Sequence, residues 1–169
     1  MSELQIRRAQ ARDIDGLCAL IFEHGSNAWN YLPEAEVRTH LQGLADGSVQ
    51  AVLAERESEL LGFVSYRLSR DFERYQPPQR RGQAQAYICE AVTQRQATGQ
   101  GLGSRLLRQA LSHLAEQGVH DVYIDRHEEN AASAGMMRKA GFVEIESYAD
   151  PERRPYGSGR TTVCCLRRP

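Results

Sequence analysis

The sequence has almost no lysine, no long hydrophobic run and no excess of either charge. Its 169 residues include 21 Lys and Arg against 22 Asp and Glu, and Lys139 is the only lysine. A formal net charge of −1 creates no global field that would attract nucleic acid or an anionic membrane. No apolar run approaches the length that a membrane-spanning helix needs. We therefore expect neither a nucleic-acid partner nor a membrane partner.

The cysteine and histidine patterns of metal sites and disulfide frameworks are also missing. The four cysteines, Cys18, Cys89, Cys164 and Cys165, form no C-x-x-C pair, and the histidines share no metal-ligand spacing with them. Neighbouring residues of a strand point to opposite faces, so Cys164 and Cys165 cannot pair comfortably with each other. The N-terminal segment lacks the apolar core of a signal peptide. These features predict reduced thiols in a cytoplasmic protein without a metal.

The chain does contain a regular succession of strand and helix patterns. Strand patterns cover residues 4–8, 49–54, 60–68, 87–93, 119–125, 142–148 and 161–166, and helical patterns cover 13–24, 33–46, 102–117 and 130–139. The order is β-α-α-β-β-β-α-β-α-β-β, with polar loops at 69–84 and 149–159. We predict one α/β (α+β) domain over residues 1–169, with a mixed sheet of about seven strands flanked by four helices. A doubly wound nucleotide-binding fold is excluded, because the early strands are not each followed by a helix.

A glycine-rich stretch lies where the fourth strand pattern turns into the third helix. It reads Thr98-Gly99-Gln100-Gly101-Leu102-Gly103-Ser104. Glycine lets the backbone approach a ligand closely, and the first amides of a helix are unpaired and partly positive. The stretch therefore predicts a pyrophosphate site, for which a tight turn without a ligand is the alternative.

A second pattern follows about thirty residues later. It reads Asn130-x-x-Ser133-x-x-x-Met137-x-Lys139-x-Gly141-Phe142. With the glycine stretch and the order of elements, it resembles the GNAT acetyltransferase superfamily over nearly the whole chain. The family's phosphate motif fits in two registers, starting at Gln96 or at Thr98. The second register places paired leucines on the core face of the helix, and we prefer it.

The resemblance implies acetyl-CoA as co-substrate and transfer of its acetyl group to a primary amine by direct attack in a ternary complex. It places the thioester beside a splayed strand near Val92 and Thr93. The pyrophosphate falls on Thr98, Gly99, Gln100, Gly101, Leu102, Gly103 and Ser104, and the pantetheine on Asn130 and Ser133.

The catalytic assignment starts from Glu90, a carboxylate inside an apolar strand. Desolvation there would raise its pKa and suit it to act as a base, while a solvated or ion-paired glutamate is the alternative. Met137 stands where the family often has the tyrosine that protonates the leaving thiolate, and a thioether donates no proton. Tyr148 is our candidate for that acid, with Tyr123, Tyr156 and water as other sources of the proton, and a structural role is the alternative for each tyrosine.

The acceptor site is predicted from parts that wall the cleft in this family. Trp29, Tyr31 and Tyr75 are candidate substrate-binding residues. The arginines of the two later loops are candidate ligands for a carboxylate or phosphate, and solvated loop charges are the alternative: Arg74, Arg80, Arg81, Arg153 and Arg154. We expect a small metabolite or amino-acid-like amine as the acceptor, and a homodimer is possible. The competing hypothesis is a binding or regulatory module that keeps the fold without turnover, which Thr98 and Met137 favour.

Overall fold

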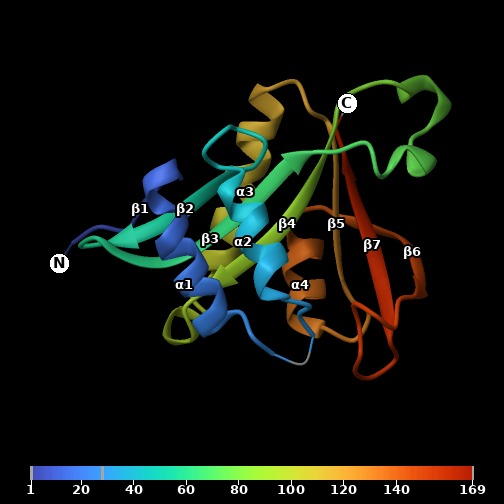
Figure 1. Ribbon diagram of the computed structural model, residues 1–169. Helices are drawn as coiled ribbons and strands as arrows, with labels where there is room; N and C mark the ends of the chain where they lie inside the picture. The colour runs from blue at the N-terminus through green and yellow to red at the C-terminus, as the bar shows by residue number, and fades with distance from the viewer. Residues whose placement is uncertain (1, 28, 169) are drawn as a thin grey trace.

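A computed structural model describes residues 2–27 and 29–168. In this part of the chain, seven strands form one sheet and four α-helices cover it (Figure 1). The strands are β1 (Gln5–Arg8), β2 (Gln50–Arg56), β3 (Glu59–Leu68), β4 (Gln85–Thr93), β5 (Asp121–His127), β6 (Val143–Ala149) and β7 (Arg160–Arg167). The helices are α1 (Ile14–His24), α2 (Glu34–Gln42), α3 (Leu102–Glu116) and α4 (Ala131–Lys139). The predicted fold class and element order are confirmed.

The sheet has the order β1-β2-β3-β4-β5-β7-β6. All neighbouring strands are antiparallel except β4 and β5, which are parallel because α3 connects them as a crossover. The sheet is therefore mixed, with its one parallel pair in the middle.

Among the described helices, none is long and apolar enough to cross a bilayer.

Each face of the sheet is covered by its own helices. The apolar side of α3, including Leu106 and Leu107, packs on one face together with Met137 of α4. On the other face, Leu17 of α1 and Leu41 of α2 pack against the first half of the sheet. These leucines are fully buried, so the helices are fixed to the sheet mainly by apolar burial.

The second half of that other face is covered by residues 69–84, which the sequence analysis predicted as a loop. The segment contains two short 3₁₀ turns, Glu73–Tyr75 and Pro78–Arg80. Its Phe72 ring stacks on Tyr123 of β5 with ring centroids 4.6 Å apart. The segment is thus held on the sheet by an aromatic cluster, in a region that none of the described α-helices covers. Such packing leaves no periodic pattern in the sequence.

The parallel pair is short. β4 and β5 pair from Gln85 opposite Asp121 to Ile88 opposite Ile124, and the pairing ends there. A register shift between β3 and β4 leaves Cys89 as an extra residue, which is a β-bulge. The predicted splay near Val92 and Thr93 therefore begins earlier, directly after Ile88, and leaves the backbone of 89–93 unpaired on its β5 side.

A core substitution tests this account of the packing. Leu106→Ala removes a side chain with 0% exposure and should lower the free energy of unfolding by about 2–5 kcal/mol. Leu68→Ala, at a side chain that is 55% exposed, should change it by less than about 0.5 kcal/mol. Urea denaturation followed by circular dichroism measures both. Equal losses in the two variants would contradict the assignment of the α3 face as core.

Candidate active site

The glycine stretch forms the N-terminus of α3. Gly99 and Gly101 have φ angles of +86° and +76°, which side-chain-bearing residues rarely adopt, and Gly101 is the N-cap of the helix. No side chain caps α3, so its first amides are free to receive an anion. Six residues of the predicted phosphate site line one cavity of about 440 Å³: Thr98, Gly99, Gly101, Leu102, Gly103 and Ser104.

The structure favours the register that starts at Thr98. A Cβ at Gly103 would lie 3.4 Å from the Met136 sulfur, so this glycine allows α3 to pack closely on α4. Gln96 and Gln100 instead line a different hollow beside Arg56 and Arg105. Thr93 borders the phosphate cavity, whereas Gln100 does not line it.

A second cavity lies where β4 and β5 diverge. It is smaller, with a volume of about 90 Å³, and Glu90 and Val92 of β4 line it with Asp125 of β5. Ala91, Ser133 and Met136 line both cavities, so the two spaces meet at the gap between the strands. Such a pair of adjoining cavities can hold a coenzyme on one side and an acceptor on the other.

Glu90 lines the small cavity because of its position after the bulge. Val92 packs with the α1 and α2 core, and Glu90, two residues earlier on the same strand, shares that face. Desolvation, and then the nearby negative charge of Asp125, raise the pKa of Glu90 to about 8, while Arg153 and Arg154 oppose the rise. A carboxyl group with this pKa exchanges protons near neutral pH, as a general base must.

Asp125 is the centre of a polar network on the opposite wall. Its carboxylate accepts a hydrogen bond of 2.9 Å from the Tyr87 hydroxyl and two of 3.3 and 3.4 Å from Arg153. Arg154 lies 3.6 Å away and is 5% exposed. Burial is the main cause that raises the pKa of Tyr87, and the carboxylate beside it adds to the effect. Two guanidinium groups thus face the small cavity beside Asp125.

Two loops and the end of β5 meet beside this cavity. Arg154 donates to the backbone carbonyl of Trp29 at 3.1 Å, and the Trp29 ring lies 4.6 Å from the ring of His127. His127 in turn contacts the carbonyl of Tyr156 at 2.7 Å. The α1–α2 loop and the β6–β7 loop are therefore joined to each other and to the end of β5. Trp29 takes part in these contacts between loops, and Tyr31 lines the cavity itself.

The second motif positions α4 against the gap. The Asn130 side chain accepts from the Ser133 amide at 3.2 Å and caps the helix, which explains an asparagine there. Asn130 and Ser133 both line the small cavity, and Ser133 also reaches the phosphate cavity. Met137 is 4% exposed and belongs to the core, so this position contributes packing and no proton donor.

Two of the tyrosines proposed for the site lie elsewhere. Tyr75 packs in the aromatic cluster and donates to Glu146, and burial raises its pKa. Tyr148 packs against the same cluster, and burial followed by the charge of Asp125 raises its pKa. Neither lines the small cavity, so the structure does not bring them to Glu90.

The sequence also predicts reduced thiols and no metal site. Within residues 2–27 and 29–168, no group of three or more His, Cys, Asp or Glu side chains is placed to hold a metal. All four cysteines are free. Cys89 lines the small cavity, but burial raises its pKa to about 12, so its nucleophilic thiolate is scarce.

Comparison with known proteins identifies the family. The sequence model of the acetyltransferase (GNAT) family matches residues 14–142. An L-methionine sulfoximine/L-methionine sulfone acetyltransferase of Pseudomonas paraeruginosa is 30% identical over 143 residues, which are 81% of this chain and 78% of the relative. The chain belongs to the GNAT acetyltransferase family, and it is an acetyl-CoA-dependent N-acetyltransferase.

Solved structures agree with this fold. The ribosomal-protein-alanine N-acetyltransferase of Brucella melitensis superposes with a TM-score of 0.74 at 22% identity, over 97% of this chain and 99% of the other. A ribosomal L7/L12 α-N-protein acetyltransferase in complex with coenzyme A gives 0.69 at 20% identity, over 97% and 93%. At these identities the likeness shows the fold alone.

Substituting the helix cap tests the phosphate site. Gly101→Val should weaken acetyl-CoA binding by more than about tenfold, since the side chain disturbs the amides that face the cavity. Gly47→Val is the matched control, because Gly47 also has a positive φ, of +82°, and open space around it, but lies far along the chain before β2. Calorimetric titration measures both. Equal affinities in the two folded variants would contradict the assignment.

The raised pKa of Glu90 predicts a pH dependence. The base is the ionised form, so kcat/KM should rise with pH up to about 8 and then level. Glu90→Gln should remove this inflection and lower kcat by about 10²–10⁴. The ammonium of the acceptor titrates in both proteins, so the difference between the two profiles isolates Glu90. Identical profiles for wild type and Glu90→Gln would rule out Glu90 as the base.

Proposed function

We propose that the enzyme acetylates a small primary amine that also carries a carboxylate, as an amino acid does. The observation that carries the proposal is the small cavity at the strand gap, which holds Glu90 near two arginines and opens toward the phosphate cavity. An amine beside Glu90 and a carboxylate beside Arg153 would match the charges of the walls.

The chain's own groups can perform the transfer in a ternary complex. Bound acetyl-CoA supplies a thioester carbonyl that an amine can attack. Glu90 removes a proton from the incoming ammonium, directly or through a water molecule. The unpaired backbone of 89–93 offers amides to the carbonyl oxygen as negative charge develops on it. Because Met137 donates no proton, water protonates the departing thiolate in this scheme.

The size of the cavity supports a small acceptor. A volume of about 90 Å³, beside two loops that are joined to each other and to the end of β5, favours a small acceptor over a peptide. A relative that matches 81% of the chain is named for the acetylation of L-methionine sulfoximine and L-methionine sulfone. Both compounds are amino-acid derivatives, and this supports the same acceptor class here.

Location and assembly are part of the proposal. Free thiols are typical of a reducing compartment, so the four free cysteines support a cytoplasmic enzyme. Association into a homodimer stays a prediction, which sedimentation analysis can test.

A matched pair of acceptors tests the carboxylate. Arg153→Gln should raise KM for an amino acid such as methionine by about tenfold or more, through loss of a charged hydrogen-bonding partner. KM for the decarboxylated amine of the same side chain should stay the same. Arg70→Gln, in an exposed ion pair with Glu73, is the control. Thiol release from acetyl-CoA measures the rates. An equal rise for both acceptors would overturn the carboxylate assignment.

A further inference from the structure

A polar pair, buried at Ser65 and half-buried at His40, lies directly beside Glu90 in an apolar layer. The Ser65 hydroxyl of β3 and the His40 Nε2 of α2 are 2.9 Å apart. Ser65 has 0% exposure, and its neighbours in the layer are apolar side chains such as Phe63 and Leu41. Burying a hydroxyl and an imidazole together costs free energy unless each finds a partner, and here they partner each other.

The strand register brings this pair to Glu90. Ser65 lies opposite Glu90, just as Phe63 lies opposite Val92. Phe63 and Val92 belong to the core beneath α1 and α2, so Ser65 and Glu90 face the same side of the sheet. Opposite residues of antiparallel strands have Cβ atoms about 4.5–5.5 Å apart, which is within reach of a glutamate carboxyl, directly or through one water.

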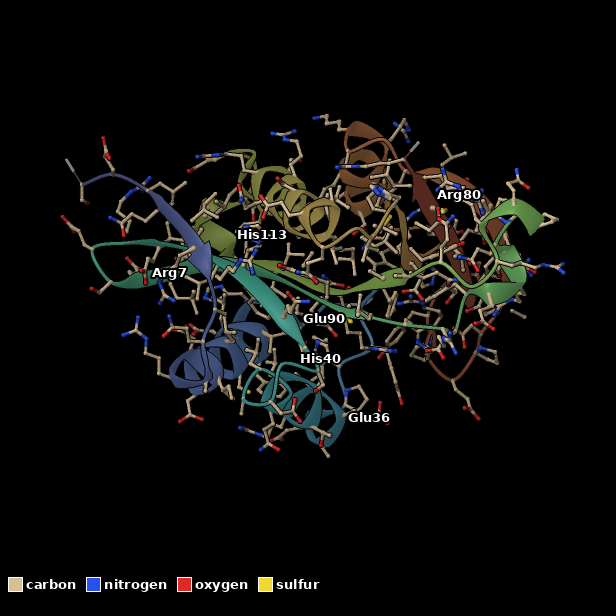
Figure 2. The ribbon with its side chains drawn as sticks, turned by 90° about the horizontal axis from the view of Figure 1, so that it is seen from above. Arg7, Glu36, His40, Arg80, Glu90 and His113 are labelled. Carbon is tan, nitrogen blue, oxygen red and sulfur yellow. The ribbon has the colours of Figure 1, made fainter. Side chains whose placement is uncertain are left out.

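The pair connects the small cavity with the surface of α2. Glu90 lines the cavity, Ser65 is sealed inside the layer, and His40 is partly exposed. In Figure 2, Glu90 lies on the sheet, His40 lies next to it on α2, and Glu36 lies farther from the sheet on the same helix. The three groups Glu90, Ser65 and His40 therefore form a row from the acceptor side to water.

The reaction produces a proton that has to leave. An ammonium acceptor brings three N–H protons, of which the amide keeps one and the thiol of coenzyme A takes one. The C–N bond forms, the C–S bond breaks, and the third proton is released. When coenzyme and product fill the two adjoining cavities, the open routes from Glu90 to water through those cavities are occupied.

We propose that Ser65 and His40 conduct this proton from Glu90 to solvent. The protonated Glu90 carboxyl donates to Ser65 Oγ, the Ser65 proton passes to His40 Nε2, and His40 releases a proton from Nδ1 to water. Ser65 and His40 each end with as many protons as they began with once the imidazole returns to its first tautomer, and Glu90 is again a carboxylate. The inference rests on the proposed role of Glu90 as the base.

The electrostatic surroundings suit a neutral imidazole. Burial, and to a smaller extent the positive charge of Arg67 on β3, lower the pKa of His40 to about 4. At neutral pH the ring is therefore uncharged, so one ring nitrogen is free to accept from Ser65. The other charged or titratable groups around the row are Glu36 on α2, Cys89 beside Glu90, Asp125 on β5, and Arg153 and Arg154 above the cavity.

Two substitutions separate proton conduction from a purely structural tie. His40→Gln keeps an amide near Ser65 but carries no proton onward, and Ser65→Ala interrupts the row in the middle. Each should lower kcat by about tenfold, with KM for acetyl-CoA unchanged within about twofold. Added imidazole should restore part of the rate of the His40 variant. The double variant should be no slower than either single one, because both break the same path.

The chain supplies a matched control on the opposite face of the same sheet. His113 of α3 lies on the other side of the sheet from His40 (Figure 2). It is also buried beside a hydroxyl, with its Nδ1 3.2 Å from the Tyr66 Oη. Burial lowers its pKa as well. His113→Gln removes a comparable buried histidine away from Glu90 and should leave kcat unchanged.

The outcomes are distinct. If His40→Gln and Ser65→Ala stay folded and turn over at the wild-type rate, the proton path is wrong while Glu90 keeps its role. If they lose only melting temperature, the pair is a structural tie between α2 and β3. If Glu90→Gln itself shows an unchanged pH profile, the proposed base fails first, and the path fails with it.

Discussion

The site depends on one constraint, the divergence of two parallel strands. β4 and β5 exchange hydrogen bonds only as far as Ile88 and Ile124, and beyond this point the backbone of β4 has no partner on that side. Unpaired amides inside a protein are costly unless something satisfies them, and a substrate that lies in the gap can do so. The bulge at Cys89, the entry into α3 and the small cavity all lie where the strands separate. Two adjoining cavities on opposite faces then meet at the same gap.

Placing Glu90 at this gap has a cost in stability. Its pKa is about 8 in the folded protein against 4.5 for an ordinary glutamate, so between these values the folded state binds more protons than the unfolded state. The favourable contribution of the protonated form is complete below the unfolded pKa and is lost as the pH rises through the folded pKa. The carboxylate that acts as the base is thus the form that the fold tolerates least. The negative charge of Asp125 raises the pKa of Glu90 further, and the positive charges of Arg153 and Arg154 lower it.

The fold could be predicted from the sequence because periodicity and spacing are local. The leucines of α3 recur at helical spacing, and the glycines before it permit the left-handed backbone found there. The site was predictable only in part. Glu90 stood out as a carboxylate in an apolar strand, but its facing depends on the bulge, which no local pattern reveals. Tyr75 and Tyr148 lie in an aromatic cluster formed by residues distant in sequence. Ser65 and His40, 25 residues apart, meet only through the packing of α2 on β3.

The most direct test of the central claim is an amide NMR titration of the protein with acetyl-CoA. If the strand gap receives the thioester, the amide signals of residues 89–93 should shift together with those of 99–104, at the same coenzyme concentration. The signals of β1, the edge strand three positions from β4 in the sheet, should stay in place. Shifts confined to the hollow beside Arg56 and Arg105, with residues 89–93 unchanged, would show that the coenzyme binds elsewhere and would contradict the account.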